Sequence, residues 1–204
     1  HDIWYPDSLL EIIYHYIQTA EKEDLKTGKK TKKMIFPRFH QLTAVKQLVD
    51  SVRKSGTGGK YLIQHSAGSG KTFTISWLAH QLSQIHSKED KRIFDSVIVI
   101  SDRKVIDKQL KDAVKQFEKK LGVVQWAEKS SLLKEALETG INIIVTTIQK
   151  FPFVVEEIGK LKGKNFAVII DEAHSSQGGE GMRTVKKTLT YTSLENAEEE
   201  DPEE

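Results

Sequence analysis

The residues best suited to chemistry form one short glycine-rich run at residues 65–72. It follows an apolar run and precedes a helical pattern, which is the context that a phosphate-binding loop requires. Two glycines permit backbone angles that turn successive amides toward one point, and a helix N-terminus adds to their attraction for phosphate oxygens. A lysine can reach the β- and γ-phosphates of a nucleotide, and the following threonine hydroxyl can bind Mg²⁺. The predicted nucleotide-binding residues are Ser66, Ala67, Gly68, Ser69, Gly70, Lys71 and Thr72.

The first position of this loop departs from the usual pattern, because His65 stands where the motif G-x-x-x-x-G-K-T begins with glycine. We expect other residues to make the turn, so that this position need not be glycine. The alternative is a Gly-Ser turn that happens to precede Lys-Thr. The apolar run before the loop and the helical pattern after it favour the nucleotide-binding interpretation.

A second candidate group is acidic and closes an apolar run: Asp171-Glu172-Ala173-His174. Carboxylates at the C-terminal end of a buried strand lie where α/β sheets bind ligands. Asp171 is suited to hold Mg²⁺ through water, and Glu172 to orient or deprotonate an attacking water. His174 could relay between this site and the rest of the protein. The alternative is a solvated turn, which the glycine-rich loop about a hundred residues upstream disfavours.

Short apolar runs alternate with amphipathic stretches from residue 60 onward, and these elements must position both groups. We expect strands at residues 61–64, 96–101, 123–126, 143–146 and 166–170, and helices near residues 71–86, 103–120, 130–138 and 150–160. The runs at 97–100 and 167–170 are apolar at every position, which is typical of strands covered by helices on both faces. The alternation predicts a parallel, doubly wound α/β sheet.

The N-terminal part of the chain has a different pattern. Residues 7–20 predict a helix whose apolar face holds Leu9, Leu10, Ile13, Tyr14 and Ile17. Residues 26–38 are basic, and we expect either a flexible loop or a surface that faces DNA. Residues 39–54 predict a second helix, with an apolar side at Leu42, Val45, Val49 and Val52.

The composition excludes several classes of protein. The chain has 204 residues, of which 38% are hydrophobic and none is cysteine. A disordered chain, a disulfide framework, a thiolate zinc site and a cysteine nucleophile are therefore excluded. No apolar run approaches the ~18 residues of a membrane span, and no basic-then-apolar leader opens the chain. We expect a cytoplasmic protein without membrane contact, in which Trp4, Trp77 and Trp126 are packing residues.

The formal net charge of +2 is unevenly distributed. Residues 195–204 hold seven of the 29 acidic residues and no base, so residues 1–194 carry 31 basic and 22 acidic residues, a net +9. A basic body is expected of a protein that binds a phosphate backbone. The acidic tail predicts a solvated loop.

Both chemical groups resemble motifs of one family, the superfamily 2 helicases of the DEAH type, where they would be motifs I and II. Upstream, Pro37-Arg38-Phe39-His40-Gln41 resembles the adenine-reading Q motif. There Gln41 would bond the adenine edge, and Arg38 would stack on it or clamp it. Residues 101–109 resemble motif Ia, and residues 146–151 resemble a later strand-contact motif. These flanking motifs, with Ser176-Gln177, are similar to the motor subunit of type I restriction enzymes. The resemblance covers about residues 36–180.

The resemblance implies a RecA-like domain that binds ATP and Mg²⁺ and grips duplex DNA. In that family the subunit assembles with specificity and methylation subunits, and it pulls DNA past the complex before a nuclease domain cuts it. Helix N-termini near residues 103 and 150 would add amide donors for DNA phosphates. The lysines farther along the stretch 103–120 are expected to form an ordinary solvated face. The residues expected to contact DNA phosphates are Arg103, Lys104, Thr147, Gln149 and Lys150.

Three parts are expected under this resemblance. Residues 1–35 would be a helical connector from a nuclease domain, residues 36–181 the first RecA-like motor domain, and residues 182–204 a loop and acidic tail leading toward a second motor domain. Nothing after residue 181 resembles motif III, and residues 1–35 show no nuclease signature. The second motor domain would supply an arginine finger, so we expect this chain alone to bind ATP weakly and to hydrolyse it slowly or not at all.

Other functions remain open at this stage. Another superfamily 2 enzyme, such as an RNA or DNA helicase or a remodelling ATPase, would share these motifs, and the flanking sequence would discriminate between them. A degenerate ATPase domain that only binds a partner is disfavoured by the intact Lys71, Thr72, Asp171 and Glu172. A P-loop kinase or GTPase is disfavoured by the Asp-Glu-Ala-His group and by Gln41, which predicts adenine over guanine.

Overall fold

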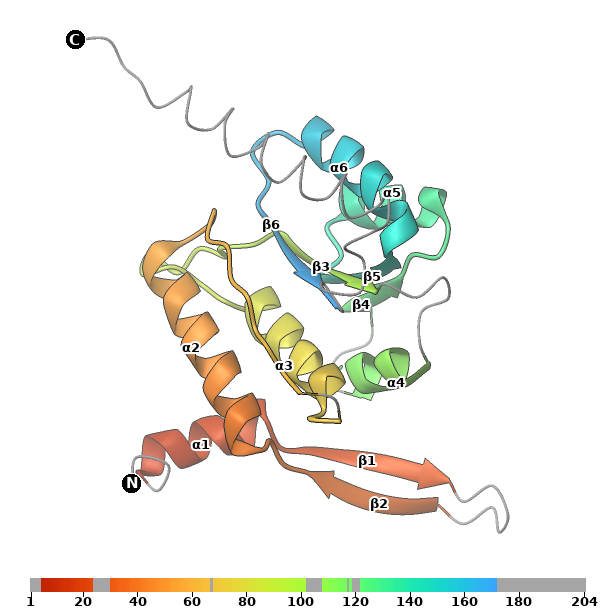
Figure 1. The fold of residues 1–204 in the computed structure, drawn as a ribbon. Coiled ribbons are helices and arrows are strands. Elements are labelled where there is room, and N and C mark those ends of the chain that lie inside the picture. Colours follow the sequence, from red (N-terminus) through yellow and green to blue (C-terminus); the bar gives the residue numbers. More distant parts are fainter. Residues whose placement is uncertain are drawn as a thin grey trace, which may run out of the picture.

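Four parallel strands form the central sheet of the protein (Figure 1). The computed structural model describes residues 5–23, 30–66, 68–101, 108–116, 118 and 122–171. Across the sheet the strands are β4 (Val124–Trp126), β5 (Ile143–Thr147), β3 (Ser96–Ser101) and β6 (Phe166–Ile170). All three neighbouring pairs are parallel. Because parallel strands need crossover connections, a helix follows each of the first three strands along the chain.

Alternate side chains of the strands enter two separate hydrophobic clusters. Val97 and Val99 belong to the first cluster, while Ile98 and Ile100 belong to the second. This is the period of two that a strand imposes. All six residues of β3 are buried, as predicted for a strand covered on both faces.

Helices cover both faces of the sheet (Figure 1). The first cluster draws on α2 (Phe39–Ser55), α3 (Lys71–Ser83) and α4 (Lys108–Gln116). The second draws on α5 (Ser130–Thr139) and α6 (Phe151–Lys160). A short 3-10 helix, η2 (Ile148–Lys150), precedes α6. The predicted doubly wound α/β architecture is therefore confirmed, and each helix predicted after residue 38 is present. Of the helix predicted at residues 103–120, the structure describes α4, and the residues on either side of α4 lie largely outside the described part.

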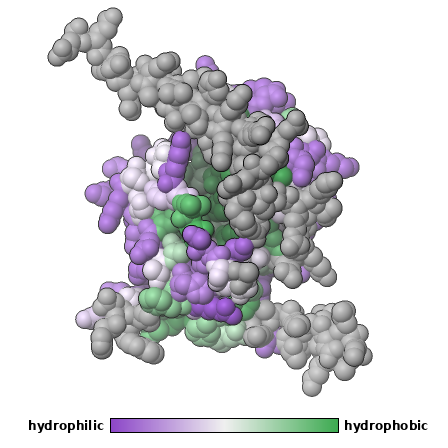
Figure 2. Space-filling view, viewed as in Figure 1, coloured by the Kyte–Doolittle hydropathy of each residue, from purple (hydrophilic) through white to green (hydrophobic). Residues whose placement is uncertain are grey.

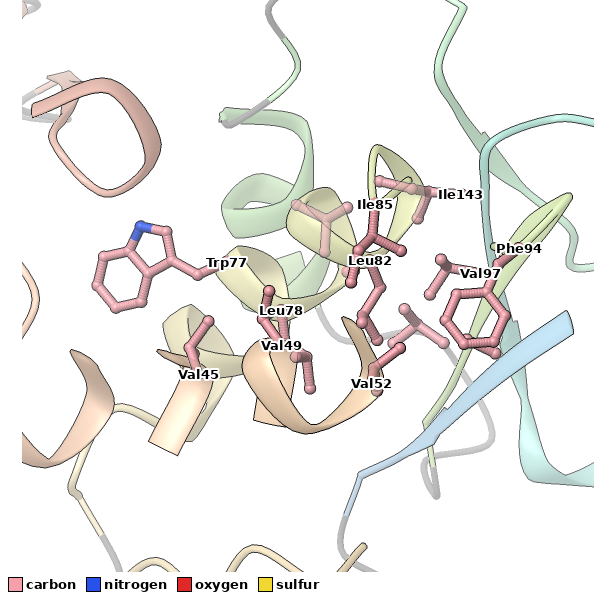
Figure 3. Packing of buried hydrophobic residues seen from close by; sticks show 14 of the residues in the cluster. Val45, Val49, Val52, Trp77, Leu78, Leu82, Ile85, Phe94, Val97 and Ile143 are labelled. Carbon is pink, nitrogen blue, oxygen red and sulfur yellow. The ribbon is translucent and has the colours of Figure 1, made fainter. Parts of the chain in front are cut away.

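Helices α2 and α3 pack against each other through apolar side chains that recur at the helical period. Val45, Val49 and Val52 recur at helical spacing on α2 and lie toward Trp77, Leu78 and Leu82 of α3 (Figure 3). All six are at most 6% exposed. Burying a side chain of this size stabilises the fold by about 1.5–3 kcal/mol. The predicted apolar side of this helix is thus the one that packs.

The N-terminal segment is a helix followed by a β-hairpin, and here the sequence prediction was partly wrong. α1 (Pro6–His15) stops short of the predicted end at residue 20. β1 (Gln18–Glu23) then pairs antiparallel with β2 (Lys30–Ile35), where a linker or loop was expected. The register runs from Gln18 opposite Ile35 to Glu23 opposite Lys30. Pairing with β1 therefore makes a strand of part of the polar, basic stretch.

The predicted apolar face of α1 is also not the face that packs against the core. Leu10, Ile13 and Tyr14 are between 49% and 62% exposed, whereas Ile12 packs against the first cluster. Apolar surface is visible at the lower edge of the molecule, toward the end where α1 lies (Figure 2). Just beyond the helix, the fully buried Tyr16 accepts a hydrogen bond at its carbonyl oxygen from Trp77 Nε1 (3.0 Å), which fastens this segment to α3.

Residues 61–64 were predicted to form a strand, and this prediction was wrong. They run toward the phosphate loop without joining the sheet. The Ser51 hydroxyl donates to the Tyr61 hydroxyl at 3.2 Å, and Leu62 is 86% exposed. The hydrogen bond from Ser51 therefore holds the segment at the end of α2, and the apolar side chains of the segment are only partly buried.

Several predicted features lie outside the described residues. They are Trp4, Ala67, Arg103, Lys104, Glu172, His174, Ser176, Gln177 and residues 182–204.

Candidate functional site

Two left-handed glycines shape the loop that leads into α3. Gly68 has φ +72°, and Gly70 has φ +86° and forms the N-cap of the helix that begins at Lys71. Side chains are strained at such angles, so both positions favour glycine. His65 is not among the described residues with positive φ. The expectation that this position need not be glycine is therefore confirmed.

Gln41, on the first turn of α2, fastens the loop to that helix. Its side chain is 3% exposed, and its Nε2 donates to Gly70 O at 2.9 Å and to Ser69 O at 3.3 Å. Its Oε1 accepts from Arg38 N at 2.8 Å, which pairs the backbone N–H of the N-cap residue of α2. A Cβ on Gly70 would lie 2.7 Å from Gln41 Nε2. The structure thus gives Gln41 a loop-holding role that the sequence analysis did not assign.

A pair of histidines lies beside the same loop. His40 Nε2 is 3.2 Å from Ser69 O, and the His40 and His65 ring centroids are 5.3 Å apart with an edge-on angle of 62°. Burial lowers the pKa of His65, and His40 and Lys71 lower it further. No motif assigned a role to His40. The available signal was its position next to Gln41 on the helix turn that faces the loop.

The first turn of α3 presents Lys71 and Thr72, both half-buried. The Ser76 hydroxyl donates to Thr72 O at 2.9 Å. Ser69 Oγ is buried and has no hydrogen-bond partner among the described residues. Leaving a buried hydroxyl unsatisfied costs about 1–3 kcal/mol, so a phosphate oxygen is a fitting partner for it.

The carboxyl ends of three strands bring other predicted site residues to one edge of the sheet. The register pairs Ser101 with Thr147 and Ile100 with Ile170. Asp171 directly follows β6, and its backbone N–H donates to Ile100 O at 2.9 Å. Thr147 and Asp171 therefore lie on either side of β3, at the edge where α/β sheets bind ligands.

The predicted DNA-contact residues differ in their accessibility. Thr147 is 6% exposed, so its side chain offers little surface to a ligand. Gln149 is exposed and Lys150 is half-buried, and both lie on η2 just before α6. Lys150 is also the N-cap residue of α6. Gln149, Lys150 and the N-terminus of α6 therefore form the accessible part of this set.

The residues present fit Mg²⁺ held together with a nucleotide. The described residues contain no group of three or more His, Asp or Glu side chains that could hold a metal by themselves. Mg²⁺ characteristically binds one or two carboxylates together with substrate phosphates, and keeps several waters. The Asp171 carboxylate and the Thr72 hydroxyl are oxygen ligands of the kind this ion prefers.

Comparison with known proteins identifies the family of this chain. The family model described as SWI2/SNF2 ATPase matches residues 40–194, which include both the phosphate loop and the acidic group. Among the relatives is the endonuclease subunit of the type I restriction enzyme SauCOLORF180P of Staphylococcus aureus (strain COL). It is 33% identical over 154 residues, which are 74% of this chain and 16% of that protein.

Two other relatives carry similar descriptions. The C-terminal part of the MpnIIP type I restriction enzyme endonuclease subunit of Mycoplasma pneumoniae is 33% identical over 158 residues, 70% of this chain and 73% of that protein. The MjaVIIIP endonuclease subunit of Methanocaldococcus jannaschii is 24% identical over 92% of this chain and 20% of its own length. This chain spans about a sixth of the length of its staphylococcal relatives. The chain belongs to the type I restriction enzyme endonuclease subunits, in the part that carries their SWI2/SNF2-type ATPase domain.

Proposed function

We propose that this chain is the ATP-binding half of a DNA-translocating motor in a type I restriction endonuclease. The observation that carries the proposal is the glycine loop at the start of α3, whose Ser69 and Gly70 carbonyls are held by Gln41. Gln41, on the first turn of α2, would thereby both contact the adenine base and hold the phosphate-binding loop. The relatives supply the setting, because their printed descriptions are those of type I restriction enzyme endonuclease subunits.

In this proposal the nucleotide lies across the N-termini of α2 and α3. Gln41 gives both Nε2 protons to the loop, and its Oε1 receives one bond from Arg38 N. A carbonyl oxygen has two lone pairs, so one remains on Oε1. The adenine amino group can donate to it, whereas guanine presents an acceptor at that position. The Arg38 side chain is exposed at the same turn and would stack on the base or clamp it.

The remaining residues of the site divide the phosphate chemistry. Lys71 would neutralise charge on the β- and γ-phosphates, and Thr72 and Asp171 would hold Mg²⁺. Glu172 would orient or deprotonate the attacking water. Slow or absent turnover in this chain alone is expected, since the arginine finger would come from a second motor domain.

Duplex DNA would lie along the carboxyl edge of the sheet, beyond the nucleotide. Arg103, Lys104, Gln149 and Lys150 would contact backbone phosphates, which position DNA without reading its sequence, whereas the buried Thr147 side chain is not assigned such a contact. Such contacts suit a motor that must move over any sequence. Specificity and methylation subunits would be the protein partners, and the cytoplasm the site of action. In the part of the chain that the structure describes, no helix has the length and apolarity needed to cross a membrane.

A remodelling ATPase is the second candidate, and the match to the SWI2/SNF2 model favours it over an RNA helicase. Both candidates share the nucleotide site and a duplex DNA substrate. Cleavage of DNA by the full-length protein in complex with methylation and specificity subunits would favour the restriction enzyme. DNA-stimulated ATPase activity without cleavage in that complex would favour the remodelling ATPase.

Nucleotide binding by the chain itself is the most direct test. Calorimetric titration with ATP and Mg²⁺ should show binding that is lost in Lys71→Ala and retained in Lys162→Ala, a matched lysine on an exposed turn. GTP should bind more weakly than ATP. Duplex DNA should stimulate ATP hydrolysis by the full-length subunit, and no stimulation would count against a translocase. A turnover number above ~1 s⁻¹ for the isolated chain would contradict the expected need for a second motor domain.

A further inference from the structure

His40 contributes a hydrogen bond to the phosphate loop that no motif describes. Its Nε2 lies 3.2 Å from Ser69 O. A carbonyl oxygen can only accept, so His40 Nε2 must carry the proton and donate it. Gln41 Nε2 donates to the same carbonyl at 3.3 Å and to Gly70 O at 2.9 Å. Two successive residues of α2 therefore hold two successive carbonyls of the loop.

Holding these carbonyls also fixes the direction of the loop amides. In a planar trans peptide the C=O and the following N–H point in opposite directions. When Ser69 O is turned toward α2, the Gly70 N–H points away from α2. When Gly70 O is turned toward α2, the Lys71 N–H likewise points away. These two amides stand at the N-terminus of α3, where backbone N–H groups attract anions.

His65 supports the ring of His40 from the side. The two rings meet edge-on, with centroids 5.3 Å apart. The His65 Nε2 atom is buried and has no hydrogen-bond partner among the described residues. Burial lowers the pKa of His65, which favours the uncharged ring as the surface that packs against His40. The contact with His40 explains why a histidine can stand at position 65, where the backbone does not require glycine.

We propose that His40 is a positioning residue of the phosphate loop, which aims the Gly70 and Lys71 amides at the nucleotide phosphates, and that the His65 ring braces it. This inference rests on the proposed nucleotide-binding function. It adds to that function a second donor, next to Gln41, on the helix that precedes the loop.

The test compares His40 variants of the full chain by calorimetric titration with ADP in the presence of Mg²⁺. His40→Gln places an amide nitrogen near the position of Nε2 and keeps a donor. His40→Met has a similar length and no donor. One hydrogen bond contributes about 0.5–1.5 kcal/mol, so Met should weaken ADP binding about two- to twelvefold. Gln should bind within about twofold of wild type, and this rescue separates donation from general packing.

The outcomes are distinguishable from failure of the proposed function. If wild type binds ADP and His40→Met binds as tightly, or if Gln is as weak as Met, the positioning role is refuted. If wild type does not bind ADP, the proposed function fails and this inference fails with it. Should His40→Met not fold, His40→Asn replaces it, because its shorter amide does not reach Ser69 O. For the brace, His65→Phe should retain affinity that His65→Ala loses, and equal losses would refute it.

Discussion

Replacing Gly70 by alanine probes the contact between α2 and the phosphate loop most directly. Gly70 has φ +86°, and a Cβ there would meet Gln41 Nε2 at 2.7 Å. Two glycines provide matched controls: Gly68, with φ +72° in the same loop, and Gly140, with φ +72° at the C-cap of α5. At both controls a Cβ would meet nothing within 4 Å. All three substitutions introduce backbone strain, but only Gly70→Ala also brings a Cβ into close contact with Gln41 Nε2.

The expected magnitudes follow from these contacts. A left-handed conformation costs a non-glycine residue about 1–2 kcal/mol. Alanine offsets about 0.4–1 kcal/mol of this cost, because it lowers the conformational entropy of the unfolded chain. Gly68→Ala and Gly140→Ala should therefore each lower the free energy of unfolding by about 1 kcal/mol. At Gly70 the Gln41 amide must also move away from its two carbonyls, and a buried donor left unsatisfied costs a further 1–3 kcal/mol or so.

Urea denaturation of the chain without ligand gives the unfolding free energies, and titration with ADP and Mg²⁺ gives the effect on binding. Gly70→Ala should be about 2–4 kcal/mol less stable than wild type and should lose ADP binding. Gly140→Ala should bind ADP as wild type does, because it lies outside the site. Gly68→Ala should weaken binding at a stability equal to that of Gly140→Ala. If Gly70→Ala were no less stable than Gly140→Ala, the close contact with Gln41 would be refuted.

Three further predictions concern Gln41 of α2, Trp77 of α3 and the buried Tyr16 that contacts Trp77. Gln41→Glu keeps the acceptor for Arg38 N but replaces the amide donor with a carboxylate oxygen that faces the loop carbonyls. Urea denaturation should therefore show an unfolding free energy lower by about 2 kcal/mol or more. Wild-type stability would contradict the assigned hydrogen bonds. Trp77→Phe removes the bond to Tyr16 O, and its melting temperature should fall by about 2–6 °C; an unchanged value would exclude a stabilising role for that bond. Burial raises the pKa of Tyr16 from 10.0 to about 12. The neutral phenol therefore stabilises the fold fully below pH 10, and this contribution, about 3 kcal/mol, is lost as the pH rises toward 12. Wild type should lose more stability than Tyr16→Phe between pH 10 and 12, and parallel losses would contradict the raised pKa.

The elements that the sequence predicted well are those whose signal is local and whose environment is uniform. β3 and β6 are both present where apolar runs predicted strands; β3 is fully buried, whereas β6 stands at the edge of the described sheet and is only partly buried. α2 carries Val45, Val49 and Val52 at helical spacing, and that face is the buried one. The loop glycines were recognised because left-handed turns restrict residue type.

The features that were missed depend on partners far away in the sequence. β1 and β2 form by pairing with each other, and neither segment has a local apolar pattern that predicts this partner. Residues 61–64 have the composition of a strand but contact α2 through Tyr61. α1 exposes the face with the stronger apolar pattern, while Ile12 packs on the core. Hydrophobic period alone does not decide which side of a short terminal helix finds a partner.

The phosphate loop shows why a local motif describes only part of a site. The motif spans residues 65–72, yet the groups that orient its carbonyls lie 28 and 29 residues upstream, on the first turn of α2. A loop with two left-handed glycines has many accessible conformations when it is isolated, and only some of them align its amides. The bonds from His40 and Gln41 select among these conformations before any ligand binds, which reduces the entropy that binding would otherwise lose. A chain that keeps Gly-Ser-Gly-Lys-Thr but lacks these two donors would therefore match the motif and still bind phosphate poorly.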